Sequence, residues 1–167
     1  MYKYLLLILS TSCASITQAE EVKVTRLRRH IIKIREGIKP PYANLIAKHI
    51  VKASRVYNVE SRLLAAIFMV ESNFRLHAVR KDRRKRPTDY GIGQIHISNI
   101  RRLGLDKKRL LYDLEYSIMV SAMVLAEIKK RKGKREKYYW VRYNCGSRSL
   151  KRRTCRRYKR KVKRYYK

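Results

Sequence analysis

The stretch SRLLAAIFMVESNF at residues 61–74 is an apolar run that ends in one carboxylate, Glu71. Its apolar side chains recur with a helical period, which places Leu64, Ile67 and Phe68 on the same face as Glu71. The carboxyl is therefore expected to lean toward the core. Partial withdrawal from water raises the pKa of a carboxyl, and a Glu in that state can donate a proton near pH 7. The alternative is a Glu at a helix end that faces solvent.

Two later blocks combine polar side chains with glycines, which let a backbone approach a ligand closely. They are Asp89-Tyr-Gly-Ile-Gly-Gln-Ile95 and Tyr143-Asn-Cys-Gly146. The order Glu-Ser, Gly-x-Gln, Tyr-Asn-x-Gly resembles the catalytic domain of the lytic transglycosylases, goose-lysozyme-like enzymes that cut the glycan strands of peptidoglycan. The resemblance runs from about Tyr42 to the C-terminus and is closest to small single-domain members associated with secretion systems and pili.

The resemblance implies a mainly α, lysozyme-like α+β fold, with a short β-hairpin between the catalytic helix and the helices that follow. It implies that Glu71 is the single general acid and base at the β-1,4 bond between N-acetylmuramic acid and N-acetylglucosamine. Glu71 would protonate the glycosidic oxygen and then accept the proton of the muramoyl C6 hydroxyl, whose attack on C1 leaves a 1,6-anhydro end. Two alternatives stay open: a hydrolytic muramidase that uses water, and a non-catalytic cationic protein that binds cell wall or other polyanions.

Four further residues match substrate-binding positions of the family, namely Ser72, Gln94, Tyr143 and Asn144. The Ser72 hydroxyl is expected to bond the substrate or to steady the acid, unless it bonds only its own helix backbone. The Gln94 amide suits the N-acetyl groups and hydroxyls of sugars. The Tyr143 hydroxyl is expected near the acid, and Asn144 is expected to fix its loop.

Three nearby residues modify this interpretation. His96 stands where the small family members often have Asn, and Cys145 stands where a small residue is usual. Both leave the acid in place and bear on the sugar subsites. Asp89 is the obvious candidate for a second carboxylate, but the family pattern favours a role in holding the hairpin. It is therefore left out of the predicted catalytic set.

The N-terminus has the pattern of a secretory signal peptide, with a short apolar run, Leu5–Leu9, followed by small polar residues. We predict cleavage after Ala19 and export to the periplasm or cell wall, with lipid attachment at Cys13 as the alternative. Residues 20–41 then form a basic arm that ends at two prolines, and residues 42–167 form the catalytic domain.

Removal of the leader leaves two cysteines, Cys145 and Cys155, in an exported protein. An even pair in an oxidising compartment predicts a disulfide. This bond would tie the Tyr143-Asn-Cys-Gly loop to the last helix.

The formal net charge is +32, from 44 Lys and Arg against 12 Asp and Glu. Basic runs occur at 81–86, 129–137 and 151–167. Such a surface attracts polyanions in a salt-dependent way. The candidates are carboxylates and phosphates of the cell wall and an anionic membrane surface, whereas the leader argues against nucleic acid. The alternative is a solvated basic face without a specific partner.

Helical periodicity predicts helices over Tyr42–Tyr57, Ser61–Ser72, Ser98–Leu103, Asp113–Lys130 and Cys155–Tyr166, and residues 78–95 predict a hairpin or loop. In the first helix, Leu45, Ile46, His49, Ile50 and Val56 are expected to face inward. Asn58 or Ser61 is expected to cap the second helix. Trp140 is assigned to the core rather than to a sugar site.

The four histidines, at positions 30, 49, 77 and 96, lack metal-ligand spacing, and the chain lacks a phosphate-binding Gly-rich loop. We therefore expect no metal and no nucleotide or other cofactor. The expected substrate is the peptidoglycan glycan strand. By analogy, an envelope-spanning secretion or pilus machine is a candidate partner, and the protein is expected to be a monomer.

Overall fold

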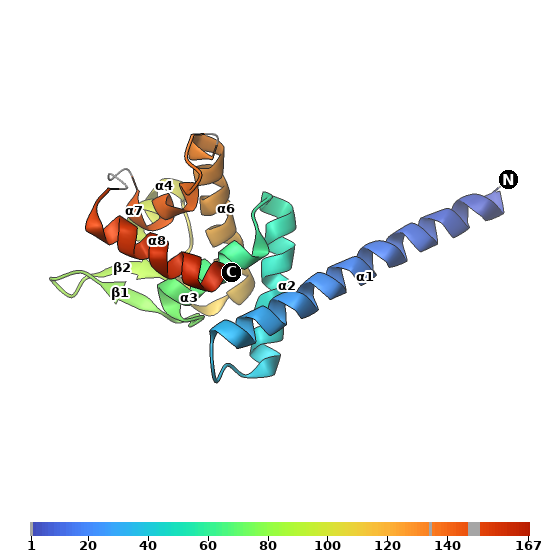
Figure 1. Ribbon diagram of the computed structural model, residues 1–167, viewed down its shortest axis with the longest axis horizontal. Helices are drawn as coiled ribbons and strands as arrows, with labels where there is room; N and C mark the ends of the chain where they lie inside the picture. Colours follow the sequence, from blue (N-terminus) through green and yellow to red (C-terminus); the bar gives the residue numbers. More distant parts are fainter. Residues whose placement is uncertain (1, 134, 147–150) are drawn as a thin grey trace.

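The computed structural model describes residues 2–133, 135–146 and 151–167, with side chains from residue 18 onward, as helices beside a small sheet (Figure 1). Three antiparallel strands form the sheet in the order β1-β2-β3. The predicted class, mainly α with a short hairpin, is confirmed. The elements are α1 (Tyr2–Ile34), α2 (Pro40–Tyr57), α3 (Ser61–Ser72), β1 (Val79–Lys81), β2 (Pro87–Tyr90), β3 (Ile95–His96), α4 (Ile97–Leu103), α5 (Lys107–Tyr112), α6 (Leu114–Lys132), the 3-10 helix η1 (Tyr139–Val141), α7 (Arg142–Cys145) and α8 (Arg153–Tyr166).

Helix α3 lies at the centre of the molecule and has the predicted bounds. Every residue from Leu63 to Phe68 is buried, because α1, α2 and α8 all pack against this helix. A helix that is apolar on all sides is stable only in such a place. The predicted cap was wrong: Glu60 is the N-cap residue and makes no side-chain capping bond, while Asn58 ends α2 in a left-handed conformation, with φ of 49°.

Helix α2 packs through small and β-branched side chains. Its buried residues are Ala43, Ile46, Ala47, Ile50, Val51 and Ala53. Two predicted inward residues were wrong, since Leu45 is 45% exposed and Val56 is 54% exposed. The alanines allow close helix contact, so the buried stripe follows them at helical spacing and turns Leu45 outward. His49 is only partly buried.

The hairpin of β1 and β2 follows α3, as predicted. Its turn is held by the Asp82 carboxylate, which accepts hydrogen bonds from the backbone N–H groups of Arg84 and Arg86 at 2.8 and 2.9 Å. The pairing shifts register between Arg80 and Lys81, and such an irregularity re-aims neighbouring side chains. Strand β3 pairs with β2 through Asp89 and His96.

The helices after the sheet are capped by their own sequence. Helix α4 ends at Gly104, whose φ is 61°, as the predicted stop requires. Asp113 begins α6 by accepting a hydrogen bond from the Tyr116 N–H at 2.9 Å. The short helix α5 was not predicted, although Asp106 caps it in the same manner.

The basic segment of residues 20–34 belongs to α1 and packs on the domain. Leu27 and Ile31 are buried in the same core as α2 and α3, and α1 packs along α2 in Figure 1. This part of the predicted basic arm is therefore helical and contributes to the core. Ala19 lies within α1, and cleavage after it stays a prediction. Among the described residues, no helix combines the length and the apolar character needed to cross a membrane.

The C-terminal elements close over α3. Trp140 is 5% exposed and belongs to the core, as predicted. The structure contains the predicted disulfide between Cys145 at the end of α7 and Cys155 in α8, with Cα atoms 5.9 Å apart. Both cysteines are buried in the main core. The bond therefore fixes α8 against the loop that follows Tyr143.

Loss of this disulfide is expected to destabilise the protein. A cross-link that closes a short loop contributes about 2–4 kcal/mol to the free energy of unfolding. Reduction of the purified protein, or replacement of both Cys145 and Cys155 by Ser, should lower the thermal midpoint in calorimetry. Adding reductant to the double variant is the control and should change nothing, whereas an unchanged midpoint on reduction of the wild type would contradict the expectation.

Candidate active site

Glu71 lies in the last turn of α3, where the helix ends at Asn73 in a left-handed conformation with φ of 55°. Its side chain is only 3% exposed, as the helical pattern predicted. Glu71 nevertheless lines an open cleft of about 760 Å³. The carboxyl is therefore withdrawn from water but accessible to a ligand that enters this cleft.

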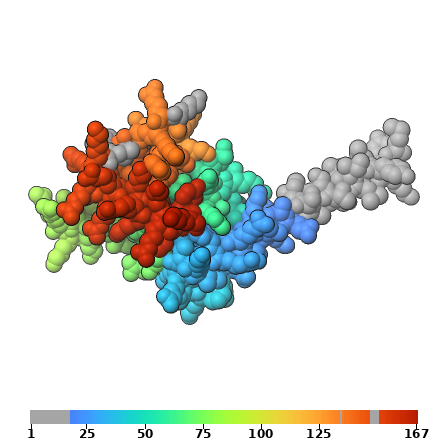
Figure 2. Space-filling model, viewed as in Figure 1, coloured from blue at the N-terminus to red at the C-terminus, as the bar shows by residue number. Residues whose placement is uncertain are grey.

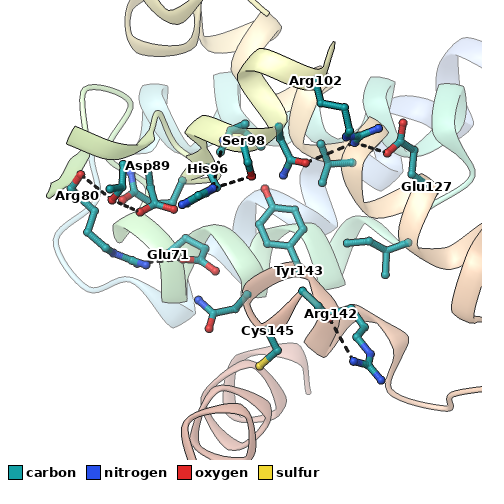
Figure 3. Close-up of a pocket in the computed structure, with 18 of the residues that line it drawn as sticks. Glu71, Arg80, Asp89, His96, Ser98, Arg102, Glu127, Arg142, Tyr143 and Cys145 are labelled. Atoms are coloured by element: carbon teal, nitrogen blue, oxygen red, sulfur yellow. Dashed lines mark hydrogen bonds and ion pairs between the residues drawn. The ribbon is translucent and has the colours of Figure 1, made fainter. Parts of the chain in front are cut away.

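The cleft has two ends with different chemistry (Figure 3). Glu71 lies at one end with Arg80 and Asp89, and the ion pair of Arg102 and Glu127, with N and O 2.7 Å apart, lies at the other. The remaining lining residues come mainly from the hairpin, α4, α6 and α7; they are Thr88, Gln94, Ile95, His96, Ser98, Asn99, Val124, Ile128, Arg131, Lys132, Arg142, Tyr143, Asn144, Cys145 and Gly146. Hydroxyls, amides and charged groups thus surround the cleft.

Arg80 of β1 forms an ion pair with Glu71 across the start of the cleft. Its Nη2 atom lies 3.2 Å from Glu71 Oε2, and its own side chain is 47% exposed. A guanidinium at this distance favours the carboxylate and lowers the pKa of Glu71. It does so against the larger effect of burial. This pair was not predicted, because only the hairpin brings the two residues together.

Two further groups act on the same carboxyl. Asp89 of β2 raises the pKa of Glu71 by charge repulsion, and Tyr158 of α8 lowers it through an interaction of its hydroxyl with the carboxylate. Burial is the largest effect, and together these influences raise the pKa of Glu71 above its ordinary value of 4.5. A raised pKa increases the protonated fraction that a general acid needs near neutral pH.

Tyr158 is a site residue that the sequence reasoning missed. It is 5% exposed, and its hydroxyl has no hydrogen-bond partner of normal geometry among the described atoms, so its interaction with Glu71 falls short of a full bond. Burial beside the Glu71 charge raises the pKa of Tyr158. A signal was present in the spacing of Cys155, Tyr158 and Val162 along one face of a very basic helix.

The loop between β2 and β3 has two positions that admit only glycine. Gly91 has a φ of 76°, and a Cβ there would meet the Leu110 carbonyl oxygen and the Ser117 hydroxyl. A Cβ at Gly93 would lie 2.7 Å from the Tyr143 hydroxyl and would overlap Ser121. The glycines were predicted to let the backbone approach a ligand, but the close approach that the structure shows is to α5, α6 and α7 of the protein itself.

Ser72 lies next to the acid but does not line the cleft. It is buried, and its Oγ donates to the Ile92 carbonyl oxygen at 2.7 Å and lies 3.3 Å from the Phe68 carbonyl. This placement corrects the predicted substrate contact, because the hydroxyl is engaged inside the protein. Ser72 instead connects the end of α3 to the loop between β2 and β3, which contains Gly91 and Gly93 and is called the glycine loop below.

Gln94 lines the cleft, at the end of the glycine loop, in a left-handed conformation with φ of 50°. Its Nε2 group donates to the carbonyl oxygens of Ala78 and Gly91, at 2.9 and 3.0 Å. Both amide protons are therefore used by the protein, and the carbonyl end is the part left for a sugar donor. Gln94 thus lies in the cleft, where a sugar could reach it, and the carbonyl oxygen of its side chain is the atom that could accept a hydrogen bond from a sugar. The contact itself stays a prediction.

Tyr143 and Asn144 also line the cleft, on α7. The Tyr143 hydroxyl donates to the Gly93 carbonyl oxygen at 2.9 Å and does not bond Glu71 directly. Burial, with the nearby Glu71 charge, raises the pKa of Tyr143. Asn144 is exposed at the rim.

His96 lines the cleft and caps α4. Its Nδ1 accepts a hydrogen bond from the Ser98 N–H at 3.2 Å and lies 2.8 Å from the Ser98 hydroxyl. Within the described part of the chain, no three His, Cys, Asp or Glu side chains are close enough together to hold a metal ion.

Comparison of the chain with known proteins shows its family. The model of the family "Transglycosylase SLT domain" matches residues 48–166. The chain belongs to the SLT transglycosylase family. Invasion protein IagB of Salmonella typhimurium, strains SL1344 and LT2, is 32% identical over 117 residues, which cover 66% of this chain and 70% of the relative. IagB of Salmonella typhi is 31% identical over the same coverage. No solved structure matches the chain significantly.

Membership of the SLT family makes this protein a lytic transglycosylase with peptidoglycan as its substrate. The matched residues contain the whole cleft, from Glu71 to Gly146, and α8 with Tyr158. The match begins within α2, so α1 lies outside the shared region. The predicted resemblance to a lytic transglycosylase is confirmed.

Replacing Arg80 by Gln is expected to raise the pKa of Glu71 further, because the guanidinium favours the carboxylate. Carbon-13 NMR titration of the Glu71 carboxyl, assigned by comparison with Glu71→Gln, would measure this shift. Arg83→Gln, at an exposed position in the same hairpin turn, is the matched control. An equal pKa in wild type and Arg80→Gln would mean that the ion pair does not form in solution.

Glu71→Gln is expected to gain stability relative to wild type as the pH rises. Between pH 4.5 and the raised pKa of Glu71, the folded protein keeps a proton that the unfolded chain has lost. Burial of the carboxylate thus lowers wild-type stability as the pH rises through this window, and Gln removes that effect. The difference in thermal midpoint should grow from pH 4 to pH 8. A difference that shrinks over this range would contradict a raised pKa.

Proposed function

We propose that Glu71 is the single general acid and base of this lytic transglycosylase, which cuts the β-1,4 bond between N-acetylmuramic acid and N-acetylglucosamine. The observation that carries the proposal is a carboxyl that is 3% exposed, has a raised pKa and lines an open polar cleft. Such an acid can be protonated before the bond breaks and ionised afterwards.

In the first step, protonated Glu71 donates its proton to the glycosidic oxygen, and the bond from that oxygen to the muramoyl C1 breaks. Charge then develops at C1 while Glu71 becomes a carboxylate. Arg80 and the Tyr158 hydroxyl both favour this carboxylate, so they stabilise the form that the first step produces.

In the second step, the Glu71 carboxylate accepts the proton of the muramoyl C6 hydroxyl, whose oxygen forms a bond to C1. The acid regains its proton and the product carries a 1,6-anhydro ring, without consumption of water. An attack within one sugar gains from fixed proximity. The Gln94 carbonyl end, Tyr143 and Asn144 line the same cleft and are proposed to orient the sugars.

A hydrolytic outcome is the second candidate, and one observation favours it. Asp89 lines the cleft at the same end as Glu71 and interacts with its charge. Most glycosidases use two carboxyl groups around the bond that breaks, with water as the acceptor. Asp89 also accepts a hydrogen bond from the Thr88 hydroxyl at 2.7 Å, which supports the hairpin role predicted for it. The non-catalytic alternative gives no reason for a buried acid in an open cleft.

The proposed site of action is outside the cytoplasm, in the periplasm or at the cell wall, where peptidoglycan lies. The leader pattern before Ala19 and the disulfide of Cys145 and Cys155 support this proposal. The relatives carry the name invasion protein, which is consistent with local opening of the wall for an envelope-spanning machine. We propose that the protein acts there as a monomer.

Mass spectrometry of products from purified sacculi tests the proposal. Wild type should release anhydro-muramoyl products, and Glu71→Gln should release none, because an amide cannot donate the proton. Glu127→Gln is the matched control, since it removes the carboxylate at the other end of the cleft and should keep most activity. Reducing-end muramoyl products would instead support hydrolysis with Asp89, and anhydro-muramoyl products released by Glu71→Gln would contradict the role of Glu71.

A further inference from the structure

Helix α8 has two faces of opposite character. Cys155, Tyr158 and Val162 are buried against α3 and α7. The outer face carries exposed cations, namely Arg153, Arg156, Arg157, Arg160, Lys161, Lys163 and Arg164. Figure 2 shows α8 on the open face of the molecule, between the β1–β2 hairpin and the described part of α1.

The basic side chains of this helix lack acidic partners among the described residues. Residues 137–167 contain no Asp or Glu. Elsewhere, basic side chains pair with acids, as Lys52 does with Glu115 at 2.6 Å and Arg109 with Asp113 at 2.8 Å. Within the described part of the chain, no ion pair joins an acid to a basic side chain of α8. Lys159 instead stacks on the Tyr138 ring, with Nζ 3.5 Å from its centroid.

This charge distribution opposes folding of the isolated protein. Like charges three or four residues apart destabilise a helix, and Arg153, Arg156, Arg157 and Arg160 make several such pairs. Bound anions would remove this repulsion. The outer face also has two shallow hollows, of about 420 and 630 Å³, lined by these arginines with Thr154, Lys159 and Lys163. Guanidinium groups that share a hollow can bind a carboxylate in a bidentate manner.

The surface begins at the edge of the cleft. Cys145 and Gly146 line the cleft, and the disulfide of Cys145 fixes the first turn of α8 beside them. Helix α8 then extends for about 21 Å from that point, at 1.5 Å per residue. A polymer that leaves the cleft at this edge therefore meets a row of cations.

We propose that the outer face of α8 is a second binding surface for peptidoglycan, which holds the carboxylates of peptide stems while the glycan lies in the cleft. This proposal rests on the proposed function for the identity of the polymer. The ligand is an array of carboxylates on a fixed polymer, which matches a linear row of guanidinium groups. The surface holds the enzyme on the wall between cuts and makes stem-bearing peptidoglycan a better substrate than bare glycan.

Binding is measured separately from cleavage, in the Glu71→Gln background. The test variant replaces Arg153, Arg156, Arg157 and Arg160 by Gln. The control variant replaces Lys23, Arg26, Arg29 and Lys33 of α1 by Gln, which makes the same change in net charge at exposed positions. Circular dichroism first verifies that both variants are folded. Pull-down with purified sacculi at several salt concentrations then gives the dissociation constant.

The test variant is expected to bind sacculi about tenfold more weakly than the control at physiological salt, with a shallower salt dependence. Neutralising the stem carboxylates of sacculi by amidation should weaken binding of the parent protein and leave the test variant nearly unaffected. Equal loss of binding in test and control variants would mean that net charge alone is responsible and would overturn the proposal. Stronger binding of the parent to phosphatidylglycerol vesicles or to a DNA duplex than to sacculi would overturn it as well.

Cleavage assays separate this proposal from the proposed function. With Glu71 intact, the four-arginine variant should cut stem-free glycan at the wild-type rate but cut intact sacculi more slowly. If the variant and the wild type cut both substrates at equal rates, the docking role of α8 is overturned. Absence of cutting by the wild type itself would contradict the proposed function, while the binding comparison in the Glu71→Gln background would still decide whether α8 holds the stems.

Discussion

The burial of one carboxyl group, that of Glu71, is the constraint on which the rest of the structure depends. Removal from water raises its pKa, and this requires α3 to lie inside the protein with α1, α2 and α8 around it. Arg80 and Tyr158 limit the effect by favouring the ionised form. The acid is thus held between two opposing influences, which suits a group that must give up a proton and then take one back. A fully solvated Glu would already be ionised near neutral pH and would have no proton to donate. A buried Glu without these neighbours would resist the ionisation that follows proton transfer.

The cleft depends on backbone that the protein itself makes rigid. The loop between β2 and β3 is held by three hydrogen bonds: the Ser72 hydroxyl donates to the Ile92 carbonyl oxygen, the Tyr143 hydroxyl donates to that of Gly93, and Gln94 Nε2 donates to that of Gly91. Residues that the family pattern marks near the acid therefore divide into two groups. Some, such as Ser72, shape the loop from inside the protein, while others line the space that the sugars would occupy. Rigid support of this kind positions a substrate more accurately than flexible side chains do.

The sequence predicted the central elements well because their signals are local. The apolar run of α3 is stable only in the protein interior, and the predicted bounds of this helix were correct. The prediction of the inward face of α2 was partly wrong. It favoured large apolar residues such as Leu45, whereas close packing of the alanines determines which face is buried. The ion pair of Arg80 with Glu71 depends on hairpin geometry and could not be read from spacing. Tyr158 was missed because three buried positions stand within a run of Lys and Arg, where charge obscures the helical period.

The disulfide between Cys145 and Cys155 has a consequence for the timing of maturation. One side of α8 presents Tyr158 to the acid and the other carries the basic surface, so a single covalent bond secures both to the cleft. A chain whose thiols are still reduced lacks this tether, and its last helix is held by non-covalent contacts, which include packing against α3 and α7 and a hydrogen bond from the Tyr166 hydroxyl to Glu60. Order around the acid is then greatest after oxidation. Completion of the site therefore depends on whether the surroundings are oxidising. A newly made chain in a reducing environment, without the disulfide, is the form least able to act on glycan.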